Sequence, residues 1–289
     1  MLPDSLRSEI EVQLGHKVKS LSPVSGGSIN EAAKLEIEEL GSCFLKWNRL
    51  ADPDMFVKEV TGLELLKKAD TGLRIPKVML QGTHEGQIGY LLLEFIEDGR
   101  PGNSSAKKFG RQLAALHDNR NNQFGLDEDN YIGRLPQSNN KHSDWVTFFI
   151  EERMEPQLNM ALEAGKFQSS ISAAFNAMYR ELPDIFPDAR PSLLHGDLWG
   201  GNYFYDREGT AVIYDPAVYY GHREIELAFT HLFGGFSSSF YRAYDSTLSI
   251  EPGFEDRKDI YNLYPLLVHT NLFGGSYARQ VEGIVKKFR

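Results

Sequence analysis

The chain has 289 residues with a formal net charge of −9, and 41% of its residues are hydrophobic and 25% are charged. This composition is typical of a globular protein and excludes a disordered, collagen-like or coiled-coil chain. Basic residues are outnumbered and form no cluster, so we expect neither nucleic acid nor an anionic membrane surface as a partner. A chain of this length is near the upper limit for a single hydrophobic core, so two lobes or domains are expected.

A single cysteine, Cys43, excludes an internal disulfide and a cysteine-rich zinc site, and it is typical of a reducing compartment. The first residues are polar and include acidic ones, unlike a secretory signal. The apolar run at residues 90–93 is far too short to cross a bilayer. We therefore expect a cytoplasmic protein.

The first third of the chain predicts a small β-rich lobe. Apolar residues at four-residue steps indicate a helix within residues 1–16, and a second amphipathic helix is expected from about 53 to 68. Alternating segments bounded by turn residues predict strands of an antiparallel sheet at 18–23, 32–38, 43–48, 76–80 and 88–95, with a turn at 82–86.

Beyond a polar, glycine- and proline-containing connector at 97–105, helical periodicity dominates. Apolar stripes at helical spacing begin at Phe109 and Ile171, and a third runs from Ile225 to Phe233. Short apolar strands are expected at 192–194, 203–205 and 211–214, the last two joined by a turn at 206–209. The sequence thus predicts an α+β, bilobed fold with an N-terminal lobe at 1–96, a larger helical lobe at 97–289, and a ligand cleft between them.

The strongest functional signal is the segment 195–202, His-Gly-Asp-Leu-Trp-Gly-Gly-Asn. Asp197 and Asn202 have the spacing of the aspartate and asparagine in the catalytic loop of kinases, which predicts Asp197 as the general base. Asp215 follows a predicted strand, like the metal-binding aspartate of kinases. Because Mg²⁺ prefers oxygen ligands, Asn202 and Asp215 are its predicted ligands, with ATP as the nucleotide.

Lys46 lies on the predicted strand at 43–48, in a sequence that resembles the Val-Ala-Ile-Lys pattern of kinases. A carboxylate from the next helix should pair with it, and Glu59 and Glu64 are the candidates. They are five positions apart, so they point in different directions and only one can face the lysine. We choose Glu59.

Further nucleotide contacts are expected in the same lobe. A turn with two adjacent glycines lies between the first two strands and lets backbone N–H groups approach phosphate closely. Backbone atoms at the end of the last strand would meet the adenine. These predicted nucleotide-binding residues are Ser25, Gly26, Gly27, Ser28, Glu94 and Ile96. The chain has no Gly-x-x-x-x-Gly-Lys-[Ser/Thr] sequence, so a P-loop NTPase is excluded.

The segments 195–202 and 215–224 closely resemble the fructosamine kinase family, that is, ketosamine or ribulosamine 3-kinases, within the aminoglycoside phosphotransferase and choline kinase-like group. The stretches 124–133, 145–149 and 226–235 are also similar to this family, so the likeness covers nearly the whole chain. The resemblance implies a protein-kinase-like fold and ATP-dependent phosphorylation of the 3-hydroxyl of a ketoamine on an amine or a protein lysine. A 3-phosphate makes such adducts labile, so the implied role is deglycation repair.

Three residues depart from the family pattern. Ser28 stands where some members have a cysteine, so redox switching there is not expected. Gly200 replaces the commoner serine, and Glu226 replaces the commoner aspartate, which changes how the catalytic loop is braced.

Several assignments have alternatives. Trp199 is predicted to form a wall of the acceptor pocket. The alternative is that its ring only packs under the loop. His195 is predicted to shape the loop through a backbone hydrogen bond and not to transfer protons, whereas Arg223 could anchor the fold or reach the substrate. Rival functions are a kinase for an aminoglycoside or a choline-like amine and an inactive nucleotide-binding module; the oligomeric state is left open.

Overall fold

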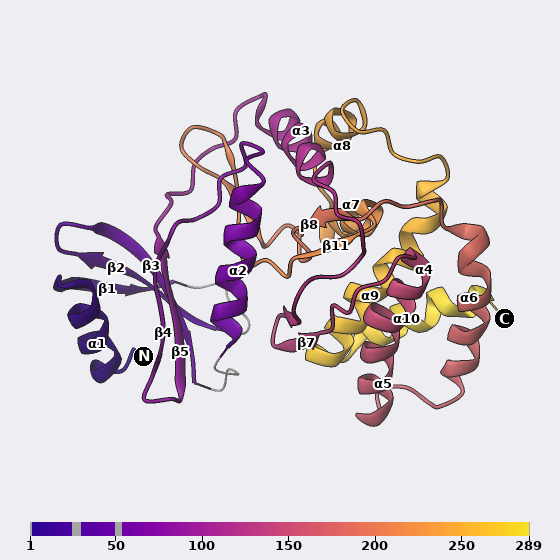
Figure 1. Ribbon diagram of the computed structural model, residues 1–289, viewed down its shortest axis with the longest axis horizontal. Coiled ribbons are helices and arrows are strands. Elements are labelled where there is room, and N and C mark those ends of the chain that lie inside the picture. Colours follow the sequence, from indigo (N-terminus) through magenta and orange to yellow (C-terminus); the bar gives the residue numbers. More distant parts are fainter. Residues whose placement is uncertain (1, 25–29, 50–53, 289) are drawn as a thin grey trace.

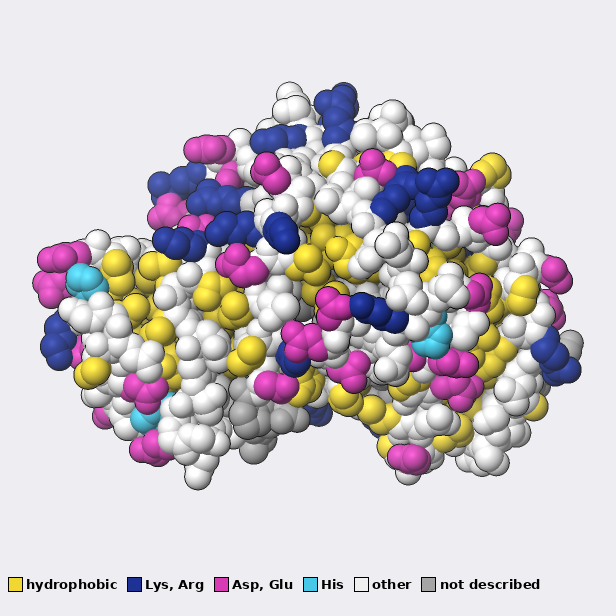
Figure 2. Space-filling view, in the orientation of Figure 1, with side chains coloured by type: hydrophobic (Ala, Val, Ile, Leu, Met, Phe, Trp, Pro, Cys, Tyr) yellow, Lys and Arg dark blue, Asp and Glu magenta, His cyan; other side chains and the backbone are white. Residues whose placement is uncertain are grey.

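A computed structural model of the chain describes residues 2–24, 30–49 and 54–288. The predicted glycine turn at 25–28 and the predicted start of the second helix at 53 lie outside these ranges. The chain forms a sheet-containing lobe and a larger helical lobe (Figure 1), which confirms the bilobed α+β architecture. In Figure 2 the outline of the surface narrows into a notch between the two lobes. Among the described residues, no helix is both long and apolar enough to cross a membrane.

The N-terminal lobe is built on a five-stranded antiparallel sheet with the order β1-β2-β3-β5-β4. Helix α1 packs on one face of this sheet, and α2 lies on the other face, between the sheet and the helical lobe (Figure 1). The elements are α1 (Asp4–Leu14), β1 (Val18–Pro23), β2 (Glu31–Ile37), β3 (Gly41–Asn48), α2 (Met55–Lys68), β4 (Val78–His84) and β5 (Ile88–Glu94).

Strand parity places the lysine of β3 on the side of α2. Cys43, Leu45 and Trp47 are buried in the cluster formed with α1. Since successive side chains of a strand point to opposite faces, Phe44 and Lys46 turn toward α2. The alternation that builds the core therefore also points Lys46 at the cleft.

The turn between β4 and β5 lies later than predicted. Strand β4 continues to His84, and the turn comprises residues 85–87. Gly82 lies within β4, and a Cβ atom at this position would lie 2.4 Å from the Tyr90 hydroxyl of β5. The glycine makes room for a cross-strand ring and does not mark the turn.

The C-terminal lobe surrounds one large apolar core, to which α2 also contributes Leu66. Three two-stranded antiparallel sheets lie within the described part of this lobe: β6 with β7, β8 with β11, and β9 with β10. Its elements are α3 (Ser105–His117), β6 (Asn130–Ile132), β7 (Leu135–Gln137), α4 (Trp145–Phe148), the π-helix η1 (Phe149–Met154), α5 (Glu155–Glu163), α6 (Ile171–Ile185), β8 (Ser192–Leu194), β9 (Tyr203–Tyr205), β10 (Ala211–Ile213), β11 (Tyr219–Gly221), α7 (Arg223–His231), the 3-10 turn η2 (Leu232–Gly234), α8 (Ser238–Asp245), α9 (Phe254–Phe273), α10 (Ser276–Val285) and η3 (Lys286–Phe288).

The helix predicted through Phe233 ends earlier. Helix α7 stops at His231, and Phe233 adopts a left-handed conformation with φ of 57° before two glycines. The prediction that Phe233 continues the apolar stripe was wrong, since Phe233 is 41% exposed, whereas Leu232 is partly buried and packs against the core of the lobe.

The stretch between α2 and β4 pairs with the other lobe. The N–H of Arg74 donates to the carbonyl of Ala211 at 2.9 Å, beside β10. The guanidinium of Arg74 donates to Asp206 Oδ2 at 2.9 Å, and this carboxylate is buried in the turn between β9 and β10. From the connector, the N–H of Gly99 donates to the carbonyl of Tyr205 at 2.7 Å. The β9–β10 hairpin is therefore hydrogen-bonded both to the stretch between α2 and β4 and to the connector between the lobes.

Candidate active site

Lys46 contacts two carboxylates from distant parts of the chain. Its ammonium forms an ion pair with Glu59 of α2 and a hydrogen bond of 2.5 Å with Asp215 Oδ1, just after β10. The side chain of Lys46 is 3% exposed and that of Asp215 is 44% exposed, so the aspartate faces the open cleft. Glu64 is exposed on α2. Of the two candidate glutamates, Glu59 is the partner of the lysine.

Two carboxylates share one ammonium in this cluster. Burial lowers the pKa of Lys46, but the negative charges of Asp215 and Glu59 outweigh it and the net shift of the pKa is upward. Burial raises the pKa of Glu59 to about 7. The positive charge of Lys46 opposes this shift, and the negative charge of Asp215 adds to it. The lysine therefore stays charged, and the pKa of Glu59 is raised above the usual carboxyl range.

The catalytic loop at 195–202 begins with a turn that requires glycine. Gly196 has φ of 84°, and a Cβ atom there would lie 1.9 Å from the carbonyl oxygen of Ala217. After this turn, Asn202 Nδ2 donates to Asp197 Oδ2 and to the Asp197 carbonyl, both at 2.8 Å. The carboxylate predicted as base and the carboxamide predicted as metal ligand are thus in direct contact.

His195 joins the loop to the segment that carries Asp215. The imidazole is completely buried, and its Nε2 donates to the carbonyl of Tyr214 at 3.0 Å. Burial lowers the pKa of His195, which keeps the ring neutral. This is the backbone-shaping role predicted for it.

Glu226 of α7 holds the start of the catalytic loop through hydrogen bonds to its backbone. Its carboxylate accepts the N–H of Gly196 at 2.6 Å and the N–H of His195 at 3.2 Å. His117 Nε2 of α3 lies 2.9 Å from the same carboxylate, and the other ring nitrogen lies 2.7 Å from the Tyr244 hydroxyl. Burial raises the pKa of Glu226, but the contacts with His117, His195 and Gly196 outweigh it, so the pKa is lowered and the carboxylate stays charged.

The environment of Asp197 suits a proton acceptor. Burial raises the pKa of its carboxyl well above the usual range; the hydrogen bond from Asn202 opposes this shift, and the charges of Asp215 and Glu226 add to it. A carboxylate with a raised pKa is a stronger base than an ordinary one. A small pocket is lined by Asp197 together with the aromatic side chains Tyr219, Phe229, Tyr264 and His269.

The remaining predicted residues lie around this centre. The Trp199 ring contacts Phe233 edge to face, with 6.0 Å between the ring centroids, and its role in an acceptor pocket stays a prediction. Arg223 donates to the carbonyl of Leu248 at 3.1 Å and lies 3.9 Å from Glu251. Of its two possible roles, the structure favours the anchoring one.

The predicted adenine contacts lie at the edge of the sheet. The N–H of Glu94 donates to the carbonyl of Lys77 at 2.9 Å, and the N–H of the next residue donates to Ser42 O at 3.3 Å. Both N–H groups are thus paired within the lobe itself. These contacts do not test adenine binding, so the roles of Glu94 and Ile96 stay predictions. The same holds for Ser25, Gly26, Gly27 and Ser28, which are outside the described residues.

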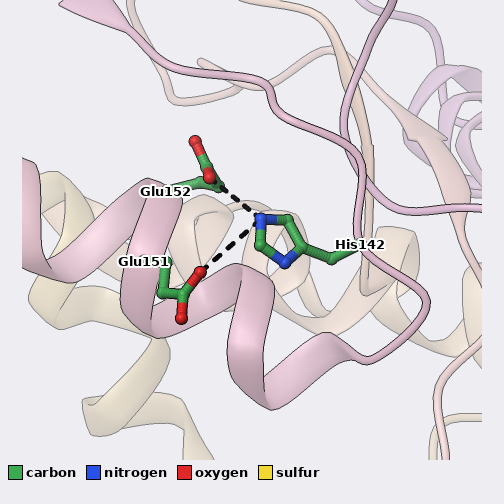
Figure 3. Close-up of side chains that lie close together, drawn as sticks. All are labelled: His142, Glu151 and Glu152. Atoms are coloured by element: carbon green, nitrogen blue, oxygen red, sulfur yellow. Dashed lines mark hydrogen bonds and ion pairs between the residues drawn. The ribbon is translucent and has the colours of Figure 1, made fainter.

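A second group of titratable side chains lies away from the cleft. His142 Nε2 is 2.9 Å from Glu152 Oε1 and 4.0 Å from Glu151 Oε2 (Figure 3). Three such groups could hold a metal ion. However, the buried Glu152 also accepts a hydrogen bond from Ser138, so its carboxylate already ties the 138–142 stretch to η1.

Sequence reasoning missed His117 as a support of the catalytic loop. It lies 109 positions from Glu226 along the chain, so no local spacing could connect them. The available signal was the acidic residue within the apolar stripe from Ile225 to Phe233, because a buried carboxylate needs hydrogen-bond donors.

Comparisons with known proteins identify the family. The sequence model of the fructosamine kinase family matches residues 4–289. A proposed ketoamine kinase from Lactiplantibacillus plantarum is 39% identical over 273 residues, which cover 94% of this chain and 95% of that protein. The chloroplastic protein-ribulosamine 3-kinase of Arabidopsis thaliana is 36% identical over 276 residues, which cover 94% of this chain and 83% of that protein.

Solved structures give the same result for the fold. A proposed fructosamine-3-kinase from Haemophilus somnus superposes with a TM-score of 0.88 at 29% identity, covering 99% of this chain and 97% of that chain. The aminoglycoside phosphotransferase APH(4)-Ia gives a TM-score of 0.64 at 16% identity, covering 99% of each chain, and shows the shared kinase-like fold. The chain therefore belongs to the fructosamine kinase family, whose members are phosphotransferases that act on hydroxyl groups.

Proposed function

We propose that this protein transfers the γ-phosphoryl group of ATP to the 3-hydroxyl of a ketoamine, a fructosamine or ribulosamine carried by an amine or a protein lysine. Family membership and the names of the relatives, a ketoamine kinase and a protein-ribulosamine 3-kinase, support this substrate class. The observation that carries the proposal is the contact between Asp197 and Asn202 in a loop braced next to the buried Lys46–Glu59 pair. The role that follows is release of glycated amines.

Lys46, oriented by Glu59, binds the α- and β-phosphates. The oxygen donors of the cleft fit Mg²⁺, a hard cation. Asn202 uses its amide nitrogen for Asp197, which leaves its oxygen for the metal, and the Asp215 carboxylate is 44% exposed to the cleft. Asn202 and Asp215 would hold Mg²⁺, which when bound neutralises charge on the β- and γ-phosphates.

Asp197 accepts the proton of the 3-hydroxyl as the hydroxyl oxygen bonds to the γ-phosphorus and ADP leaves. Trp199, two positions further along the loop, offers a ring face to the C–H surface of the sugar. Backbone groups at Glu94 and Ile96 bind the adenine.

The test is a panel of acceptors with labelled ATP and Mg²⁺: ribulosyl-lysine, fructosyl-lysine, an aminoglycoside and choline. We expect transfer to the ketoamines, with the phosphate on the 3-oxygen. Transfer only to the aminoglycoside or choline would overturn the substrate class, and ATP consumption with no acceptor on the panel would do the same.

Variants test the assigned roles. Asp197→Asn should lower kcat by about 10²–10⁴-fold with unchanged nucleotide affinity, because a positioned base contributes about that much. Asp256→Asn, at an exposed position of α9, is the matched control. Trp199→Ala should raise KM for the ketoamine and leave KM for ATP unchanged. Wild-type turnover in Asp197→Asn removes the assignment of the base.

A further inference from the structure

Helix α2 is attached to the C-terminal lobe through a segment that the proposed phosphate chemistry does not use. Asp54, immediately before the helix, accepts a hydrogen bond of 2.6 Å from the Tyr131 hydroxyl. One turn later, Lys58 forms an ion pair with Glu128. Both partners come from residues 126–131, which we call the clamp segment. This stretch belongs to the 124–133 region that resembles the family in sequence.

The clamp segment is itself fixed to the body of the lobe. Asn130 Nδ2 donates to the carbonyl of Val218 at 2.8 Å. Asn139 Nδ2 donates to the carbonyl of Glu128 at 3.2 Å, and the Asn139 N–H donates to Asp129 Oδ1 at 2.7 Å. Both asparagines are buried. Because displacing the segment would leave buried polar groups without partners, it is a rigid support.

Two further contacts hold α2 against the same lobe. A Cβ atom on Gly62 would lie 3.2 Å from the Pro216 ring and 3.3 Å from Val218, so the helix backbone packs closely on the segment between the cleft aspartate and β11. Leu66 is buried in the core of the C-terminal lobe. Helix α2 is thus fixed to the C-terminal lobe at four points along its length.

Lys58 and Glu59 are consecutive on α2, and their side chains point about 100° apart around the axis. One faces the clamp segment and the other faces Lys46. A rotation of the helix that separates Lys58 from Glu128 therefore also displaces Glu59 from the lysine.

We propose that Glu128 and Tyr131 are positioning residues for nucleotide binding: through Lys58 and Asp54 they hold α2 in the rotation at which Glu59 orients Lys46. This inference rests on the proposed nucleotide-binding role of Lys46. Its consequence is that the affinity for nucleotide phosphates depends on an ion pair outside the cleft.

Charge reversal across this ion pair tests the proposal. We expect Lys58→Glu and Glu128→Lys each to weaken the affinity for AMP-PNP with Mg²⁺ about threefold to fivefold, the range of an exposed ion pair. The double variant should recover most of the wild-type affinity, because it restores the pair with opposite polarity. Tyr131→Phe should weaken binding without a change in charge. Lys67→Glu, a charge reversal at an exposed position near the other end of α2, is the control and should bind as the wild type does.

Steady-state kinetics give a second readout. The single variants should raise KM for ATP and leave KM for the acceptor within about twofold, a split that general loss of stability does not produce. Single variants with wild-type affinity for AMP-PNP, or a double variant no better than the singles, would overturn the proposal. Binding of AMP-PNP is measured without an acceptor, so a failure of the ketoamine assignment appears only in the acceptor panel and is distinguishable from a failure of the clamp.

Discussion

The ammonium of Lys46 lies 2.5 Å from Asp215 Oδ1, although the two residues are 169 positions apart in the chain. Lys46 stands on the middle strand of the N-terminal sheet, and Asp215 directly follows β10 of the other lobe. Because the lysine is buried and also paired with Glu59, the electrostatics of the two sides of the cleft are coupled.

Lys46→Met should lower kcat/KM for ATP by about 10²–10³-fold, the usual effect of removing one electrostatic contact to a transferring group. The physical reason is that methionine keeps most of the unbranched side chain but lacks the charged ammonium. Steady-state kinetics at varied ATP measure the effect, with Lys19→Met at an exposed position of β1 as the control. A Lys46→Met enzyme as efficient as the wild type contradicts the assignment.

Glu59→Gln should change how stability depends on pH. Burial raises the pKa of Glu59 from an ordinary value of 4.5 to about 7, so the folded protein binds this proton more tightly than the unfolded chain does. The favourable contribution is present at low pH and is lost as the pH rises from about 4.5 to about 7. Urea unfolding across this window should show the wild type losing free energy of unfolding relative to Glu59→Gln. Parallel curves for the two proteins would argue against a raised pKa.

Glu226→Gln should shift the acidic limb of the pH–rate profile. Transfer requires the charged form of Asp197, so kcat/KM should rise with pH as this carboxyl loses its proton, at a pH above the usual carboxyl range. Burial is the main cause of the raised pKa, but the negative charge of Glu226 contributes. Removing that charge lowers the pKa of Asp197 and moves the limb toward lower pH. Glu251→Gln, at an exposed position, should leave the limb where it is.

Gly196→Ala should destabilise the protein by about 3 kcal/mol or more, since the residue has a positive φ and its new methyl group meets a backbone oxygen. Gly200→Ala, in the same loop, is the control: no atom lies within 4 Å of its Cβ position, and its effect on stability should stay within about 0.5 kcal/mol. Urea unfolding of both variants distinguishes the two positions. Equal stabilities would show that the loop yields more easily than its contacts indicate.

The sequence predicted best the elements whose residues alternate or repeat clearly. The bounds of β1, β8 and β9 agree with the prediction to the residue. Helix α9 was not predicted because residues 260–268 are all buried in succession, so the helix has no amphipathic period. Strands β6, β7 and β11 were not predicted because each contains a residue that is unusual in strands, Asn130, Pro136 and Gly221, whereas the equally short β8 and β9 are largely apolar.

The contacts of the site also differ in how far they could be predicted from the sequence. The contact between Asp197 and Asn202 lies within one loop, so their spacing could reveal it. Helix geometry indicated that only one of Glu59 and Glu64 can face Lys46, and the structure shows that this one is Glu59. By contrast, the brace from His117 and the clamp from Glu128 and Tyr131 join residues far apart in the chain, and only the folded arrangement brings them together.

The pairing of the stretch before β4 with the β9–β10 hairpin bears on how the protein can be divided. A fragment that ends at residue 96 would retain Arg74 but lose the carbonyl and carboxylate that its backbone and guanidinium meet. The complementary fragment would expose one edge of the hairpin. The two halves are therefore not autonomous modules, and a split or circularly permuted version should be cut elsewhere than at the connector.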